Sequence, residues 1–326
     1  MSETLPRCLQ ERDFDPSILN DLLATDDVPA TRLDREPADE VILAPWHVPV
    51  PDDYARALAA LMREPVATLS PHIVSTDNAQ FASVALAGGD AYGAHALAAA
   101  FRALCAAGFE PLAAIGGWPD AEAEALATEL QIEPGAQETG RCPVLIGEAA
   151  ESGHTASPDS VRDGDALFLI GTEAEHLGRS LYQRVIVGET RGAAATIDPQ
   201  IEAWRGRYVR RAIATEYSRA AIDIVEGGLG VALARLCSAS GIGADVSLLP
   251  ESYPHAALFG EDASRYVVAV PDEWAGMFAG NAEASGAFFR RLGAAGGERL
   301  RIGGVVDLDV AELPAYSTSD RSSSRD

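Results

Sequence analysis

A turn made of one acid and two glycines is the arrangement of residues in this chain best suited to chemistry. Glu226, Gly227 and Gly228 lie between a β-branched run that predicts a buried strand and an apolar pattern that predicts a helix. Glycine permits positive φ and close approach to a ligand, and the first N–H groups of a helix are unpaired donors that suit anions. The turn therefore predicts an anion site, or else a tightly packed connection between strand and helix.

The surrounding patterns predict alternating helices and strands, which favour an α+β or α/β fold. Helices are expected at 54–62, 91–107, 120–130, 178–187, 199–215, 228–239 and 272–284. Strands are expected at 72–75, 81–86, 111–115, 165–170, 219–225, 243–248, 265–270, 287–292 and 299–303. The stretch 131–164 is rich in proline and glycine, which predicts a loop that contains a domain boundary.

The charge of the chain excludes several kinds of function. Its formal charge is −24, and all 25 of its basic residues are arginines. The absence of lysine excludes a lysine Schiff base and a P-loop lysine. An acidic surface repels nucleic acid and anionic lipid, so we expect neither nucleic acid nor a membrane as a partner.

Two further features concern the cell compartment. Apolar runs fall short of the ~18–20 residues that a membrane helix needs, and the acidic N-terminus lacks the pattern of a secretory signal, so we expect a cytoplasmic protein. The cysteines are far apart and show no zinc-ligand spacing, which predicts buried thiols at Cys105 and Cys237.

Several segments resemble one enzyme family in the same order along the chain. The turn at 223–228, D-I-V-E-G-G, is similar to D-V-S-D-G-G, and 259–266 is similar to F-G-E-S/D-x-x-R-Y. Further similar segments are G-D-A-L-F-L-I-G at 164–171, H-L-G-R-S-L-Y at 176–182 and G-F-E-P-L-A at 108–113. Together they resemble the second half of phosphoribosylformylglycinamidine synthase (PurL), an ATP-dependent ligase of purine biosynthesis in the PurM-like, AIR synthase-related superfamily.

The resemblance implies a PurM-like fold of two domains. We expect an extended arm at 1–50 with a short helix near residues 16–23, a dimerising α+β sheet domain at 51–155, an α/β sandwich at 156–316 and a disordered tail at 317–326. An apolar sheet with an open edge needs a partner, so we expect a homodimer or pairing with a first-half PurL protein.

The resemblance also implies binding residues for Mg-ATP or Mg-ADP. The cofactor-binding candidates are Asp77, His95, Gly227, Gly228 and Glu261. The magnesium candidates are Asp77, Asp223 and Glu226. A structural alternative for Glu226 is a charge at a helix start, and for Glu261 an ion pair with Arg265, four residues on.

The chain departs from the family pattern where ligands are expected. Glu226 replaces an aspartate, which moves the carboxylate by ~1.5 Å, and magnesium demands near-ideal geometry. Ala99 and Ala103 replace a glutamate and an asparagine, and alanine can coordinate nothing.

Three functions follow from this pattern. We favour a PurL-like protein of purine biosynthesis that has lost catalysis or depends on a partner. The first alternative is an active ligase subunit that converts formylglycinamide ribonucleotide to formylglycinamidine ribonucleotide. The second alternative is a PurM-like protein that binds a small molecule.

Overall fold

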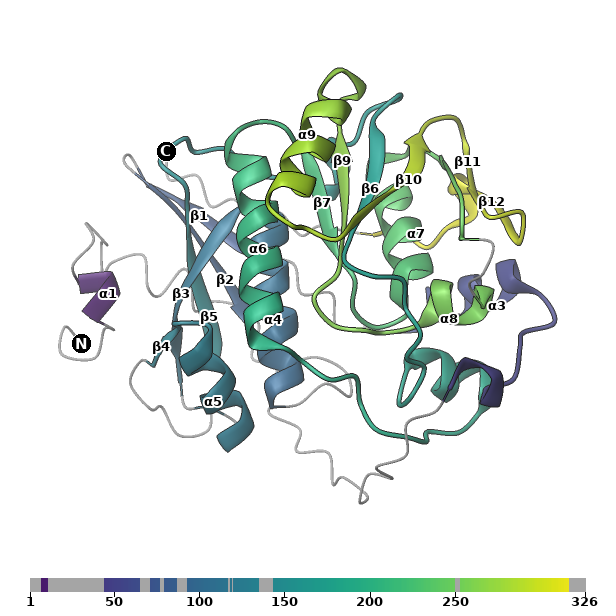
Figure 1. The fold of residues 1–326 in the computed structure, drawn as a ribbon, viewed down its shortest axis with the longest axis horizontal. Helices are drawn as coiled ribbons and strands as arrows, with labels where there is room; N and C mark the ends of the chain where they lie inside the picture. The colour runs from purple at the N-terminus through teal and green to yellow at the C-terminus, as the bar shows by residue number, and fades with distance from the viewer. Residues whose placement is uncertain are drawn as a thin grey trace.

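Two β-sheets and the helices between and around them form the molecule (Figure 1). The computed structural model describes residues 7–10, 44–64, 71–76, 79–86, 93–116, 118, 120–134, 143–249 and 253–316. The short helix expected near residues 16–23 and the tail at 317–326 lie outside these ranges. Within them, every helix is too short or too polar to cross a membrane.

The N-terminal sheet has five strands in the order β1-β2-β5-β3-β4. Its strands are β1 (His72–Ser75), β2 (Gln80–Ala85), β3 (Phe109–Ile115), β4 (Glu133–Pro134) and β5 (Val144–Ala149). All neighbours are antiparallel except β3 and β4. Helix α4 (Ala94–Ala107) packs on this sheet, and α5 (Ala121–Glu129) packs beside α4.

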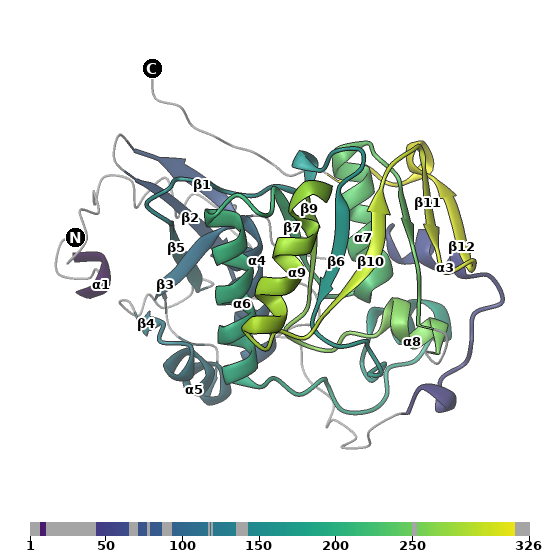
Figure 2. The same cartoon turned by 45° about the horizontal axis from the view of Figure 1, so that its top comes forward.

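The C-terminal sheet has seven strands in the order β12-β11-β8-β10-β6-β9-β7. Its strands are β6 (Ala166–Ile170), β7 (Ala220–Asp223), β8 (Ala244–Val246), β9 (Tyr266–Val270), β10 (Phe289–Ala295), β11 (Arg299–Ile302) and β12 (Val306–Asp309). Helices α6 (Pro199–Ala214) and α9 (Asp272–Ala284) lie over one face, and α7 (Gly228–Ser240) lies over the other (Figures 1 and 2).

Strand β9 shows why its sequence forms a central strand. Alternate side chains of a strand point to opposite faces. Val267 and Ala269 enter the core beneath α7, whereas Tyr266, Val268 and Val270 enter the core beneath α6 and α9. Because both faces are covered, the strand is apolar throughout. The second core continues through α4 to the N-terminal sheet, so α4 and α6 lie between the two sheets.

The loop predicted for 131–164 is wrong at its centre, because 144–149 form β5, an inner strand of the N-terminal sheet. Gly147 interrupts the apolar run there and obscures the strand pattern. A Cβ on Gly147 would lie 2.9 Å from the carbonyl oxygen of Glu110 on β3, so glycine lets these strands approach. The sequence patterns also failed to predict helix α8 (Pro254–Phe259) and strand β12. Of the helix expected at 178–187, residues 183–187 form a π-helix.

Helix α3 (Tyr54–Leu61) lies in the range expected for the N-terminal domain but packs with the C-terminal sheet. Its side chains Ala57, Leu58 and Leu61 are buried in the core beneath α7. Asp53 caps the helix by accepting a hydrogen bond from the Arg56 N–H, as expected for an aspartate at this position.

The apolar face of the N-terminal sheet turned away from α4 is buried within the chain itself. Phe81 and Ile146 are almost fully buried, and Leu9 of the short helix α1 (Arg7–Gln10) joins their cluster. The Cys8 N–H of α1 donates to a carboxylate oxygen of Glu133 at 2.9 Å. Burial of this face therefore does not require a second chain.

Candidate functional site

The turn between β7 and α7 holds the two glycines in conformations that other residues adopt rarely. Gly227 has φ of 83° and Gly228 has φ of 69°. A Cβ on Gly228 would lie 2.7 Å from the carbonyl oxygens of both Leu258 and Gly260. The glycines therefore allow the start of α7 to pack directly on the end of α8. The tightly packed connection weighed from the sequence is confirmed at this point.

Glu261 occupies the N-terminal end of α7. Its Oε1 accepts hydrogen bonds from the Gly227 N–H at 2.7 Å and the Leu181 N–H at 2.8 Å. Burial raises the pKa of Glu261 to about 8, and the charge of Glu226 adds to this, while the two N–H groups oppose it. The expected ion pair with Arg265 is replaced by these backbone bonds, and Arg265 donates instead to the carbonyl oxygen of Gly260.

Asp223 and Glu226 face arginines of the same chain. Burial raises the pKa of Asp223, and the charges of Arg102 and Arg235 oppose the shift. Burial likewise raises the pKa of Glu226, opposed by Arg184 and Arg235. The Glu226 carboxylate lies 3.7 Å from the Arg184 guanidinium, with its side chain 17% exposed. Both acids that were magnesium candidates in this turn are therefore influenced by arginines of the protein.

A buried ion pair joins the two helices beside this site. Arg102 of α4 donates to Glu202 of α6 at 2.9 Å, and the Ser264 hydroxyl donates to the same carboxylate oxygen at 2.6 Å. Both side chains of the pair are at most 8% exposed. The close approach of the helices depends on Gly206, whose Cβ would lie 2.8 Å from the Cys105 sulfur.

Helix α4 carries the positions where ligands were expected, and it is a packing element. Ala99 and Ala103 are buried. His95 Nε2 lies 2.8 Å from the carbonyl oxygen of Ala195, so the ring holds the segment before α6. The thiol of Cys105 is buried on this helix, and Cys237 is buried on α7, as the sequence predicted.

The described residues do not fit a divalent cation. They contain no group of three or more His, Cys, Asp or Glu side chains placed to hold a metal. The carboxylates of Asp223, Glu226 and Glu261 are instead balanced by arginines or backbone N–H groups. Asp77 lies outside the described residues, so its predicted role stays a prediction.

Sequence reasoning missed the arginines that balance these acids. Arg102 lies in an alanine-rich helix and Arg235 in a run of leucines and alanines, and both are buried. A buried guanidinium on an otherwise apolar helix face requires a buried anion beside it. An arginine within an apolar helix pattern could therefore have predicted that these acids have internal partners.

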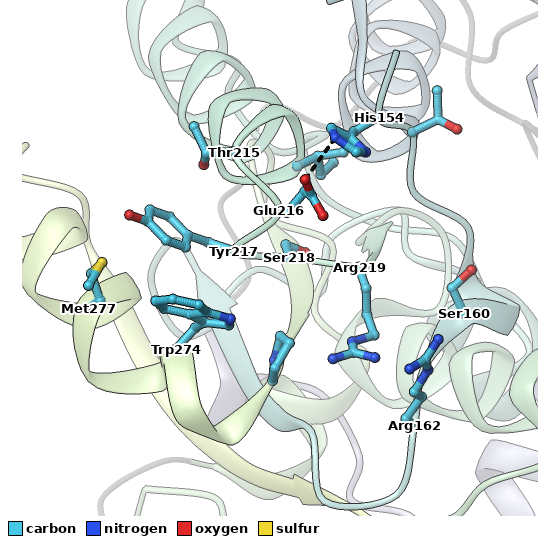
Figure 3. Close-up of a pocket in the computed structure, with 13 residues that line it drawn as sticks. His154, Ser160, Arg162, Thr215, Glu216, Tyr217, Ser218, Arg219, Trp274 and Met277 are labelled. Atoms are coloured by element: carbon cyan, nitrogen blue, oxygen red, sulfur yellow. Dashed lines mark ion pairs between the residues drawn. The ribbon is translucent and has the colours of Figure 1, made fainter. Parts of the chain in front are cut away.

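A cavity of about 710 Å³ lies at the opposite end of β7, before the strand begins (Figure 3). Its walls come from the linker that precedes β6, from the end of α6 with the residues that join it to β7, and from the start of α9. Arg162 and Arg219 line one part and Tyr217, Trp274 and Met277 another. No motif in the sequence indicated this cavity, because its lining residues come from three separate segments of the chain.

Comparison with known proteins finds relatives of about half of the chain. Residues 162–303 match the family described as AIR synthase related protein, C-terminal domain. The chain is 43% identical over 169 residues to phosphoribosylformylglycinamidine synthase subunit PurL of Allorhizobium ampelinum, and 39% identical over 168 residues to that of Brucella ovis. Each match covers 52% of this chain and 23% of the relative, so the chain matches about a quarter of their length.

Solved structures confirm the expected PurM-like fold. PurL of T. maritima complexed with ADP matches with a TM-score of 0.57 at 16% identity, over 82% of this chain and 50% of that chain. PurL of T. maritima complexed with FGAR gives 0.58 at 15% identity, over 81% and 51%. Thiamine-monophosphate kinase from Stenotrophomonas maltophilia gives 0.52 at 20% identity, over 77% and 94%.

Proposed function

We propose that this chain, a PurL-like and AIR synthase-related protein, serves purine biosynthesis as a non-catalytic half that acts with a partner. The observation that carries the proposal is that the acids at the end of β7 are balanced within the protein. Glu261 accepts two backbone N–H groups, and Glu226 lies beside Arg184.

An ATP-dependent ligase needs oxygen ligands for magnesium and donors for phosphate. Carboxylates that already face guanidinium groups bind a cation only if those groups move away. Glu261 also takes the Gly227 N–H at the start of α7, which a phosphate could otherwise use. Nucleotide binding at this end of β7 would therefore have to break internal contacts that stabilise the fold.

A partner would use an edge of a sheet rather than an apolar face. The N-terminal sheet buries its apolar face in the cluster that contains Leu9 and Phe81. Strand β1, however, lies at the end of the strand order and pairs on one side with β2. An edge strand can pair with a strand of a second chain. We propose β1 as the contact, either with a second copy or with a first-half PurL protein.

Calorimetry of Mg-ATP and Mg-ADP with the purified chain tests the loss of nucleotide binding at the β7–α7 turn. We expect no binding that depends on Glu226 or Asp77. The measurement is repeated with Glu226→Gln, Asp77→Asn and, as a control for a separate site, Arg162→Gln. Micromolar binding that Glu226→Gln or Asp77→Asn weakens would contradict the proposal, whereas binding weakened by Arg162→Gln alone would place the ligand in the distant cavity.

Addition of a first-half PurL protein tests the active alternative. Under our proposal the chain forms a complex but restores no ATP-dependent amidation. Amidation that appears on mixing, and that is lost with Glu226→Gln, would establish the active ligase subunit instead. Sedimentation of the chain alone and of the mixture measures whether the partner is a second copy or the first-half protein.

A further inference from the structure

We propose that the cavity before β7 binds a small ligand in which a planar ring is joined to an oxyanion. The cavity is separate from the β7–α7 turn, because its lining residues precede the strand whereas the turn follows it. The inference concerns a different site from the proposed function and does not depend on it. A volume of about 710 Å³ falls in the range of small-molecule sites.

Two arginines supply the anion-binding part of the cavity. The backbone N–H of Arg162 donates to Asp165 Oδ2 at 2.9 Å, and the side-chain Nε of Arg219 lies 3.6 Å from the same oxygen, so Asp165 holds the Arg162 backbone beside the Arg219 side chain. Figure 3 shows both guanidinium groups at one side of the cavity. Among the described residues, the Arg162 guanidinium has no hydrogen-bond or ion-pair partner. A planar guanidinium binds carboxylate or phosphate oxygens through paired N–H groups.

The charged groups around the Arg162 guanidinium bear on which ligand the cavity can bind. The chain carries a formal charge of −24, with roughly two acids for each base. Asp165 is buried and offsets only one of the two guanidinium charges. His154 and Glu216 also line the cavity, and they contact each other at 2.9 Å. The Arg162 guanidinium, which has no partner among the described residues, can therefore pair with an oxyanion of a ligand at the cavity.

Aromatic side chains supply the second part of the cavity. The rings of Tyr217 and Trp274 lie 5.7 Å apart between centroids with an interplanar angle of 46°. Trp274 is 39% exposed and Met277 is 47% exposed, although both are large and apolar. These side chains lie on the other side of the cavity from the arginines (Figure 3). A planar ring that stacked here would cover apolar surface that water now contacts.

The backbone beneath the site is held in an unusual conformation. Glu216 has φ of 59°, a region that residues other than glycine adopt rarely. This conformation ends α6 and directs the chain so that Tyr217 and Arg219 both line the cavity, while the Ser218 hydroxyl is held by the carbonyl oxygens of Ala220 and Ala269. The ring-binding and anion-binding parts are therefore fixed by one short segment.

Calorimetry with defined probes tests the proposal on the full chain. AMP presents a ring with phosphate and benzoate a ring with carboxylate, while adenosine and inorganic phosphate each lack one part. We expect AMP or benzoate to bind, and adenosine and phosphate to bind at least tenfold more weakly. The better of the two ring–oxyanion probes identifies which oxyanion the cavity prefers.

Variants assign the binding to the cavity. We expect Arg162→Gln and Trp274→Ala each to weaken the binding of the better probe about tenfold or more. The matched controls are Arg301→Gln on β11 and Trp46→Ala beside Tyr253, and we expect neither to change the affinity. Arg162 is exposed, so its variant keeps the fold and the test stays decisive even if Trp274→Ala is unstable. Failure of both AMP and benzoate to bind at millimolar concentration, or binding unchanged by Arg162→Gln, overturns the proposal.

Discussion

The two ends of strand β7 differ in how they balance charge, although only four residues separate them. At the end that leads into α7, the acids Asp223 and Glu226 face Arg102, Arg184 and Arg235. At the end that follows α6, the Arg162 guanidinium has no partner among the described residues and a cavity adjoins it. One end is closed by internal contacts, and the other is open to a ligand.

This difference teaches that a sequence motif marks a place in the fold without specifying which contacts its residues make there. The acid–glycine–glycine turn lies at the closed end. There Gly228 allows α7 to pack closely on α8, and Glu261 accepts a hydrogen bond from the N–H of Gly227 at the start of α7. The open end shows no motif, yet it has a guanidinium without a partner among the described residues and exposed aromatic side chains.

The largest effect is expected for Arg102→Met, which removes the guanidinium that donates to the buried Glu202 carboxylate. Loss of one partner of a buried pair costs about 3–5 kcal/mol, because the remaining buried charge loses its hydrogen-bonded counterion. Urea unfolding at pH 7 measures the free energy of unfolding. The double variant Arg102→Met with Glu202→Gln should recover at least half of the loss. A loss below about 1 kcal/mol for the single variant would show that this end is not held closed by the pair.

Gly228→Ala should destabilise the protein by about 3 kcal/mol, because a Cβ at positive φ would also meet two carbonyl oxygens at 2.7 Å. Gly241, at the other end of α7, is the matched control. It has φ of 70°, but a Cβ there meets nothing within 4 Å. Gly241→Ala should therefore cost about 1 kcal/mol, from the backbone conformation alone. Equal losses in the two variants, measured by urea unfolding, would refute the close-packing role of Gly228.

The elements were predictable where their patterns were local. Helix α9 begins and ends at the predicted residues 272 and 284, and β1 spans the predicted 72–75. Asp198 and Pro199 likewise begin α6 with a capping carboxylate and a proline in the first turn, which are local signals. Strand β5 was missed because Gly147 interrupts its apolar run and the contact it serves is with another strand.

The site was less predictable, because its determining contacts join distant residues. Arg102 and Glu202 are 100 positions apart, and Glu261 is 34 positions from Gly227. The sequence indicated which acids gather near the turn but not which cations balance them. Such pairing depends on how α4 and α6 lie between the sheets, and no local pattern specifies that arrangement.

Glu261→Gln should flatten the dependence of stability on pH. The folded pKa of Glu261 is about 8, above the usual 4.5, so the folded state binds the proton more tightly than the unfolded state. The contribution of the protonated Glu261 to the free energy of unfolding is fully present below pH 4.5 and is lost as the pH rises towards 8. The slope is at most about 1.4 kcal/mol per pH unit for one group. Urea unfolding at pH 5, 6, 7 and 8 measures it in the two proteins, and identical slopes would contradict the raised pKa.

The smallest effect is expected for Arg162→Gln, which removes the same charge as Arg102→Met but from the open end of β7. The Arg162 side chain has no partner among the described residues, so its loss leaves no buried charge behind. The free energy of unfolding should change by less than about 0.5 kcal/mol, as is usual for such surface positions. A residue that contributes little to the fold is free to serve a ligand. A loss near that of Arg102→Met would mean that the open end is also held by internal contacts, and the contrast between the two ends would fail.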